Sequence, residues 1–370
     1  MKTLFDPVQF GDIVCANRVV MAPLTRTRAS GEIPNALMAE YYGQRASAGL
    51  IIAEATQVCP EGIGYLDTPG AYTAEQAAGW RLITQAVHER GGRIVLQLWH
   101  VGRISHEQLQ PGGRSPVSSS NKAAEGAKVR LRDGAQPTSV PRPLRTDEIP
   151  GVIAAYRVAA RHAVSAGFDG VEVHGANGYL LEQFLRDSIN DRDDAYGGSI
   201  ENRARLMVEV VQAVAAEVGA GRTGLRLSPI TPANGAPQDS DAQALYEHVA
   251  RCLAPLKLAF IEVVEGATGG ARDLSAQGVK PFDYAALRRA FGGPWIVNNG
   301  YTREMAIAAL AAGEADAVSF GRPFIANPDL VQRLREDAPL EPLRQGTVYL
   351  STAEGYTDYP TLAQASTASL

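Results

Sequence analysis

The chain has 370 residues, of which 45% are hydrophobic and 20% are charged, a composition typical of a globular protein with a large core. Its net charge of −5 argues against nucleic acid as a partner, because no basic stripe is available to displace counterions from a phosphate backbone. No window approaches the ~18 uninterrupted apolar residues of a membrane-spanning helix.

The cysteines and the first residues favour the cytoplasm. Cys15, Cys59 and Cys252 are odd in number and lack metal-type spacing, which favours free thiols in a reducing compartment. The opening MKTLFDPVQFGD has an acidic residue and a proline where a signal peptide needs an apolar core. We therefore expect a cytoplasmic protein that binds small molecules, without a nucleic-acid or membrane partner, as a monomer or weak homodimer.

The first predicted element is a hairpin over residues 4–18, in which FGD separates two apolar runs, and it is expected to close the floor of a barrel. After it, short apolar runs alternate with segments of helical period. Eight runs are predicted as strands: Arg18–Thr25, Gly49–Val58, Arg93–His100, Gly170–Ala176, Gly224–Ile230, Phe260–Gly266, Trp295–Gly300 and Ala317–Ile325. They are apolar throughout, as expected for parallel strands covered on both faces.

The segments between the strands carry apolar residues at three- and four-residue steps, and several begin with Thr or Asp and end at Gly, as capped helices do. The predicted helices are Ala36–Ala48, Thr73–Gly91, Thr146–Gly167, Glu201–Gly219, Asp241–Leu256, Phe282–Gly292, Thr302–Ala315 and Asp329–Asp337. Eight strand–helix units with right-handed crossovers most simply close into a (β/α)8 barrel. An open doubly wound sheet is the alternative, but the repeat does not pause at mid-chain. Because no internal linker is evident, we predict one domain over residues 1–370.

Residues 106–145, after the third strand, interrupt the repeat. They are rich in Gly, Pro and Ser and lack helical period. A loop of this length inside a compact domain is usually functional, so we predict a lid or a pocket wall. A solvated excursion is the alternative.

Polar side chains follow several of the predicted strands, at the C-terminal ends where a barrel of this kind forms its active site. The candidates are Pro23, Leu24, Thr25, Glu54, Ala55, Thr56, Gln97, Trp99, His100, His174, Asn177, Tyr179, Arg226, Asn298, Asn299, Gly300, Gly321 and Arg322. Each alone has an ordinary explanation as a capping or surface group, but together they converge on one barrel mouth.

The last two strands predict a phosphate site. Backbone N–H groups at Gly300 and Gly321 can approach an anion closely, and Arg322 adds a planar charged donor. The loops after strands seven and eight are the usual phosphate site of this fold. Gln97 and Arg226 would then face the centre of the mouth, where an amide and a guanidinium suit the polar edge of a heterocyclic ring.

Six motifs carry a resemblance to a known family: MAPLTR (21–26), QLWHVGR (97–103), HGANGYLLEQFL (174–185), AYGGSIENRARL (195–206), FGRPFIANPDL (320–330) and EGYTDYP (354–360). The chain resembles the Old Yellow Enzyme family, which are FMN-containing, NAD(P)H-dependent ene-reductases on a (β/α)8 barrel. The resemblance covers nearly the whole chain. It is similar to the bacterial branch that reduces enones, maleimides and nitrate esters.

The resemblance implies a tightly bound, non-covalent FMN that is reduced by NADPH or NADH. The implied FMN contacts are Ala22, Pro23, Leu24, Thr25, Ala55, Gln97, Arg226, Asn299, Gly300, Gly321 and Arg322. Thr25 would bond the flavin C4 carbonyl, at a position where a second branch of the family has cysteine. Gln97 and Arg226 would bind the pyrimidine end of the ring.

On the substrate side, the resemblance implies that His174 and Asn177 donate hydrogen bonds to a carbonyl or nitro oxygen. Tyr179 would deliver a proton to the α-carbon of the alkene. Phenolic ligands would occupy the same donor pair. The implied pocket walls are Tyr65, Trp99 and Tyr356, with simple packing as the alternative for Tyr65. Some relatives have a second histidine at the position of Asn177, which bears on substrate preference.

Three alternative functions remain open at this point. The first is a barrel acting mainly on nitrate esters or nitro compounds. The second is a metal-dependent aldolase or hydrolase with Glu172, His174 and His100 as ligands, although no further ligand at suitable spacing completes the set. The third is a flavin-binding protein without turnover. The chain shows no C-terminal cysteine cluster, which argues against the iron–sulfur dienoyl-CoA reductases built on the same barrel.

Overall fold

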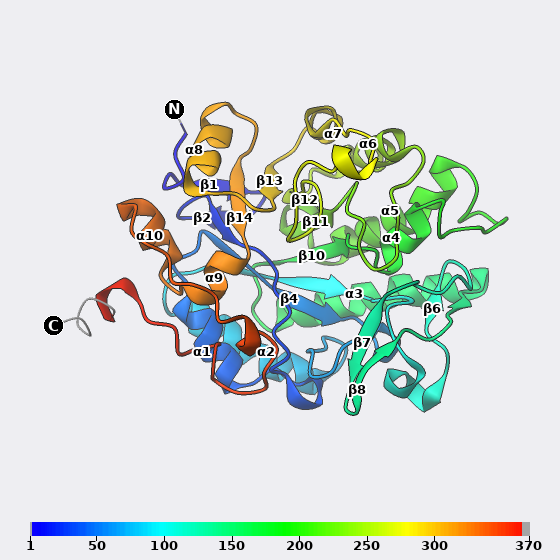
Figure 1. The fold of residues 1–370 in the computed structure, drawn as a ribbon, viewed down its shortest axis with the longest axis horizontal. Helices are drawn as coiled ribbons and strands as arrows, with labels where there is room; N and C mark the ends of the chain where they lie inside the picture. Colours follow the sequence, from blue (N-terminus) through cyan, green and yellow to red (C-terminus); the bar gives the residue numbers. More distant parts are fainter. Residues whose placement is uncertain (1, 365–370) are drawn as a thin grey trace.

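Eight parallel strands close into a barrel at the centre of the structure, a computed structural model that describes residues 2–364 (Figure 1). The barrel strands are β3 (Val19–Met21), β4 (Leu50–Gln57), β5 (Ile94–Trp99), β10 (Gly170–Gly175), β11 (Thr223–Leu227), β12 (Phe260–Val264), β13 (Trp295–Asn298) and β14 (Ala317–Phe320). Neighbours around the barrel follow the chain order, and β14 pairs with β3 to close it. The predicted (β/α)8 barrel is confirmed, since each predicted run contains a barrel strand, although β11 begins one residue before its run, at Thr223.

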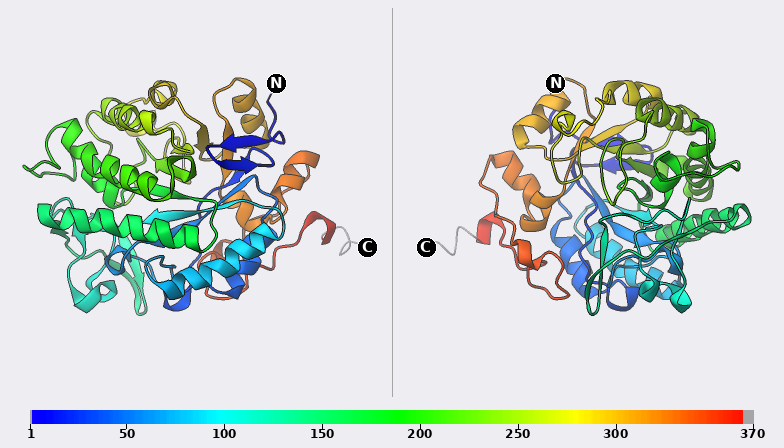
Figure 2. Two further views of the ribbon diagram at one scale, coloured as in Figure 1. Left: turned by 180° about the vertical axis from the view of Figure 1, so that it is seen from behind. Right: turned by 45° about the vertical axis from the view of Figure 1, so that its right-hand side comes forward.

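Helices surround the barrel (Figures 1 and 2). They are α1 (Ala36–Gln44), α2 (Ala74–His88), α3 (Ile149–Ser165), α4 (Leu180–Leu185), α5 (Ile200–Val218), α6 (Ala242–Leu253), α7 (Tyr284–Phe291), α8 (Arg303–Ala311), α9 (Arg322–Ala326) and α10 (Leu330–Glu336). Thr73 and Thr302 cap α2 and α8 with their side chains, and in α2 Thr73 and Gln76 form a reciprocal capping box. Asp241 and Asp329 precede α6 and α10 but make no side-chain capping bond. None of the described helices is long and apolar enough to cross a membrane.

The sequence failed to predict α4 and α9, and α9 corrects the predicted end of the eighth strand. That strand was expected to reach Ile325, but β14 ends at Phe320. Pro323 lies in the first turn of α9, where its fixed φ suits a helix and its missing N–H costs nothing. In a barrel strand, the same proline would remove a ladder hydrogen bond. The helix therefore begins at Arg322.

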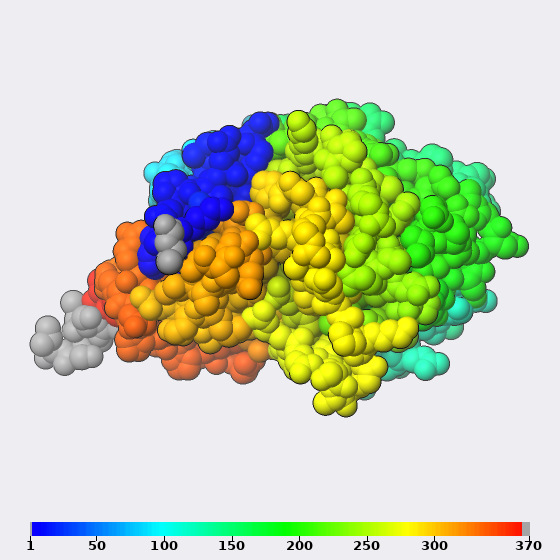
Figure 3. All heavy atoms as spheres, turned by 90° about the horizontal axis from the view of Figure 1, so that it is seen from above, coloured from blue at the N-terminus to red at the C-terminus, as the bar shows by residue number. Residues whose placement is uncertain are grey.

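The N-terminal hairpin closes the barrel floor, as predicted. It consists of β1 (Val8–Phe10) and β2 (Ile13–Cys15), which pair antiparallel. Phe10 is fully buried, and its ring meets that of Phe260 edge-on with centroids 5.8 Å apart. The segment before the hairpin lies against the part of the chain around residue 316, between α8 and β14, where Lys2 Nζ donates to Asp316 Oδ1 at 3.1 Å (Figure 3). The floor is therefore apolar and sealed, which leaves the opposite mouth for ligands.

The long insertion after β5 forms a small β-structured wall. Within it, β6 (Val117–Ser118) pairs with β9 (Arg142–Pro143), and β7 (Lys128–Leu131) pairs with β8 (Gly134–Pro137) as a hairpin. Val129 and Leu131 are buried and pack in one apolar cluster with Trp99 at the C-terminal end of β5. The β7–β8 hairpin therefore lies over the C-terminal ends of the strands, where a pocket wall was predicted.

Candidate active site

A cavity of about 1180 Å³ opens at the C-terminal ends of the barrel strands. All of the residues predicted to contact FMN or substrate except Tyr356 line it, whereas the strand-end candidates Glu54, Thr56 and His100 do not. Its volume exceeds that of a common small-molecule site, which leaves room for two ligands at once. The barrel thus brings together side chains that are spread over more than 300 positions of the sequence.

His174, at the end of β10, is a neutral hydrogen-bond donor. Its Nδ1 accepts the backbone N–H of Ala176 at 3.3 Å, so the ring proton lies on Nε2. Burial, followed by the nearby charge of Arg226, lowers the pKa of the imidazole well below its ordinary value. The ring therefore offers a fixed N–H without carrying a charge.

Tyr179 lies beside His174, with ring centroids 5.1 Å apart at right angles. Its phenol oxygen is 3.0 Å from that of Tyr65, and its ring meets Trp99 edge-on at 4.9 Å. Burial raises the pKa of Tyr179 above its ordinary value, so the phenol keeps its proton at neutral pH. Tyr65 therefore makes a hydrogen bond to Tyr179 as well as lining the cavity, which goes beyond the simple packing that was the alternative for this residue.

A polar layer lies directly beneath the cavity. Gln97 Nε2 donates to Glu172 Oε1 at 2.7 Å, while Arg226 pairs through Nε with Glu262 at 2.7 Å and donates through Nη2 to Asn298 at 3.0 Å. Burial, followed by repulsion from Glu262, raises the pKa of Glu172 well above its ordinary value. The layer therefore holds Gln97 and Arg226 in place. Because the pKa of Glu172 is raised, the carboxylate of Glu262 is the one that balances the charge of Arg226.

The structure does not assemble the three candidate metal ligands into one site. Glu172 is engaged by Gln97, and the Nδ1 of His100 accepts the backbone N–H of Gly102 at 3.1 Å. His100 does not line the cavity. Residues 2–364 contain no group of three or more His, Cys, Asp or Glu side chains that could hold a metal ion.

The loops after β13 and β14 form a cationic end of the cavity. Gly300 has a φ of +66° and open space where a side chain would project. Arg322 donates to the carbonyl of Gly269 at 2.9 Å and forms no ion pair with a carboxylate in residues 2–364. An unpaired guanidinium beside exposed backbone is the chemistry of a phosphate site.

Comparison with known proteins decides the family. Residues 3–341 match the sequence profile of the NADH:flavin oxidoreductase / NADH oxidase family. The chain belongs to this family. It is 46% identical to 12-oxophytodienoate reductase 1 of Oryza sativa subsp. japonica, over 98% of this chain and 93% of the relative.

Solved structures agree with this assignment. The fold matches that of morphinone reductase with a TM-score of 0.93 at 47% identity, over 98% of this chain and 97% of the other. It matches an old yellow enzyme homologue from Zymomonas mobilis with a TM-score of 0.91 at 47% identity, over 97% and 100% of the two chains. The predicted membership of the Old Yellow Enzyme family is confirmed, and the protein is an NAD(P)H-dependent flavin oxidoreductase of ene-reductase type.

The cavity fits the FMN of this family. Gln97 and Arg226 face its centre from the polar layer, and the Thr25 hydroxyl makes no hydrogen bond within residues 2–364. Arg322 and Gly300 line the cationic end of the cavity. These groups would hold the pyrimidine edge, the C4 carbonyl and the phosphate of FMN.

Tyr356 is the one predicted wall that the structure corrects. Its side chain is fully buried, stacked on Tyr41 of α1 at 4.0 Å between centroids, with the guanidiniums of Arg26 and Arg28 over its ring. It anchors the C-terminal segment to α1, outside the cavity. Tyr349, seven positions earlier, lines the cavity instead and is 59% exposed.

Sequence reasoning predicted a pocket wall within residues 106–145 but did not identify the residues that form it. The β7–β8 hairpin contributes Lys128, Arg130 and Arg132 to the cavity lining. The loop after β12, which contributes residues 268–270, was not predicted. The alternating charged and apolar residues of KVRLR were an available signal for the hairpin. The β12 loop carries no such pattern.

Proposed function

We propose that the protein reduces activated carbon–carbon double bonds of α,β-unsaturated carbonyl and nitro compounds. Bound FMN supplies the hydride, which it takes from NADPH or NADH. The observation that carries the proposal is the wall formed by His174, Asn177 and Tyr179, where two uncharged N–H donors adjoin a protonated phenol. The relatives named 12-oxophytodienoate reductase and morphinone reductase support a reduction of this kind.

The role of His174 and Asn177 is to hold the substrate oxygen. When hydride reaches the β-carbon, negative charge moves onto that oxygen. Fixed donors in a water-poor site stabilise this charge more strongly in the transition state than in the ground state. His174 suits the task because it donates without titrating near neutral pH.

The role of Tyr179 is to protonate the α-carbon. A phenol with a reference pKa of ~10, raised further by burial, remains protonated until the carbon becomes basic. The phenol of Tyr65 lies 3.0 Å away and can donate a hydrogen bond to the phenolate that is left behind.

The proposal predicts a yellow protein that NADPH bleaches in the absence of oxygen and that 2-cyclohexenone turns yellow again. The measurement is flavin absorbance during anaerobic mixing. Cyclohexanone, which lacks the double bond, is the matched control and should leave the reduced flavin unchanged. A protein that binds FMN and is reoxidised by oxygen but by no enone would contradict the proposal.

The β7–β8 hairpin is expected to attract the anionic coenzyme. Lys128, Arg130 and Arg132 line the cavity and form no ion pair with a carboxylate in residues 2–364. Replacing all three with Gln should lower the rate constant for flavin reduction at limiting NADPH by about tenfold at low salt, the lower end of the steering range. The wild type should lose most of this advantage at high salt, while the variant should respond weakly. Equal salt dependence of the two proteins would contradict the assignment.

A further inference from the structure

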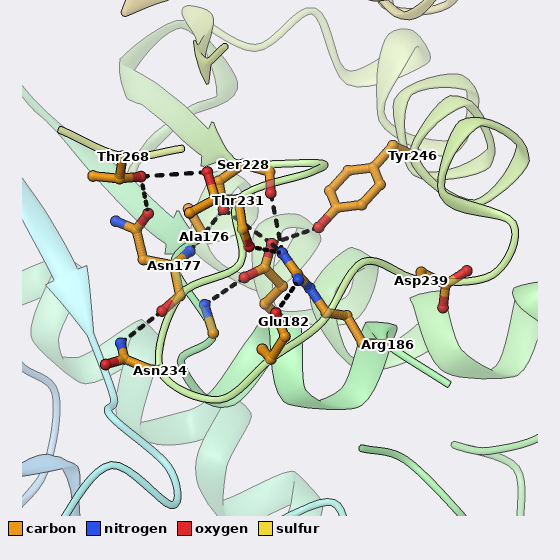
Figure 4. A network of polar contacts seen from close by, with 12 residues as sticks. Ala176, Asn177, Glu182, Arg186, Ser228, Thr231, Asn234, Asp239, Tyr246 and Thr268 are labelled. Carbon is orange, nitrogen blue, oxygen red and sulfur yellow. Dashed lines mark hydrogen bonds and ion pairs between the residues drawn. The ribbon is translucent and has the colours of Figure 1, made fainter. Parts of the chain in front are cut away.

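Asn177 is bound to the protein through three of its four polar groups (Figure 4). Its backbone N–H donates to Ser228 Oγ at 2.8 Å, its carbonyl accepts from Asn234 Nδ2 at 2.8 Å, and its Oδ1 accepts from Thr268 Oγ1 at 2.6 Å. The side-chain Nδ2 has no partner within residues 2–364. Because Asn177 lines the cavity, the donor edge of its amide is the edge left for a ligand.

The hydroxyl of Thr268 sets this orientation. Thr231 donates its own hydroxyl to the carbonyl of Gly266 at 2.6 Å and lies 3.4 Å from Thr268 Oγ1. The proton of Thr268 is therefore directed to the closer acceptor, Asn177 Oδ1. If the side-chain amide of Asn177 were rotated by half a turn, its Oδ1 would face the substrate oxygen, and two hydrogen-bond acceptors facing each other repel.

A buried network fixes the backbone of Asn177. Ser228 receives its N–H and donates to Glu182 Oε1 at 3.0 Å. Glu182 is fully buried and also accepts from Tyr246 at 2.6 Å and from Arg186 at 2.9 Å (Figure 4). Asn177 needs this support because its φ of +58° lies in the left-handed region, which asparagine tolerates but does not prefer.

The loop that carries Thr268 is itself held firmly. The side-chain Nδ2 of Asn299 donates to the carbonyls of Glu265 and Ala267 at 2.7 and 2.9 Å, and its Oδ1 accepts the N–H of Gly269 at 3.1 Å. Thr268 is therefore presented from a braced loop, although solvent in the cavity reaches it.

We propose that Thr268 and Ser228 are positioning residues that act through Asn177. Ser228 fixes the backbone of Asn177 on the Glu182 network, and Thr268 turns the amide so that its N–H edge faces the substrate oxygen. This inference rests on the proposed role of Asn177 as an oxygen-binding residue. It assigns to the loops after β11 and β12 a part in substrate binding.

The test is titration of the FMN-loaded protein with phenol, followed by flavin absorbance. Thr268→Val keeps the shape and removes the hydroxyl, and it should raise the Kd for phenol about threefold to tenfold, the worth of one net hydrogen bond. Thr268→Ser should restore wild-type binding. Thr223→Val, which removes a hydroxyl bonded to Gly219 at the floor end of β11, is the matched control and should leave the Kd unchanged. Ser228→Ala should weaken binding in the same way, and it keeps the proposal testable if Thr268→Val does not fold.

A double-mutant cycle separates positioning from a general structural effect. In an Asn177→Ala background, Thr268→Val should change the Kd by less than about twofold, because its effect passes through the missing amide. A full effect in that background would overturn the inference, as would unaltered binding by both Thr268→Val and Ser228→Ala. Unaltered phenol binding by Asn177→Ala itself would instead overturn the proposed role of Asn177.

Discussion

Tyr179→Phe is expected to slow reduction of 2-cyclohexenone by about 10²- to 10⁴-fold, the usual contribution of a positioned general acid. Phenylalanine keeps the edge-on contacts with Trp99 and His174, so the shape of the wall is preserved. What is lost is the proton for the α-carbon and the hydrogen bond with Tyr65 at 3.0 Å. Flavin reduction by NADPH should stay near the wild-type rate, because that step transfers a hydride without needing an acid.

Stopped-flow absorbance measures the two half-reactions separately. Tyr65→Phe is the matched control: it removes the same hydrogen bond but leaves the phenol of Tyr179, so it should slow enone reduction far less than Tyr179→Phe does. Equal slowing of both half-reactions by Tyr179→Phe would show that its role is not proton delivery. Equal effects of the two variants would assign proton delivery to the pair of phenols instead of to Tyr179.

The barrel could be predicted because its signals are local and repeated. Each barrel strand is a short apolar run, and caps such as Thr73 mark helix starts within a few positions. The residues at strand ends converge because parallel strands in a barrel share one C-terminal rim. Once the strands were assigned, the positions of His174, Arg226 and Arg322 at one mouth followed from topology alone.

Two of the failures depend on contacts that spacing does not encode. Tyr356 was expected to be a pocket wall from the family resemblance, but its side chain stacks on Tyr41 outside the cavity. The hydroxyl of Thr268 meets Asn177 across 91 positions of sequence. No periodicity marks such a pair. The sequence therefore predicted the residues that we propose for the reacting wall, whereas the groups that orient them required the three-dimensional arrangement.

His174→Ala is expected to lower the rate of enone reduction by about 10²- to 10³-fold, the loss observed when one oxyanion donor is removed. The Nε2–H of His174 is fixed in direction because Nδ1 is already occupied by the N–H of Ala176. Alanine leaves the substrate oxygen with the amide of Asn177 alone. Phenol binding should weaken with the same change, since a phenolate oxygen would use the same two donors.

His174→Gln is the second variant to compare. Its amide restores an N–H donor but not the geometry of the imidazole ring, so it should recover part of the rate that His174→Ala loses. The pKa of His174 lies well below its ordinary value, so the wild-type rate of enone reduction should show no titration of this residue between about pH 6 and 8. If a step in that range is present in the wild type and absent from His174→Gln, the residue works as a charged acid and not as a neutral donor. Flavin content and thermal melting of both variants, measured alongside, distinguish this outcome from loss of the cofactor.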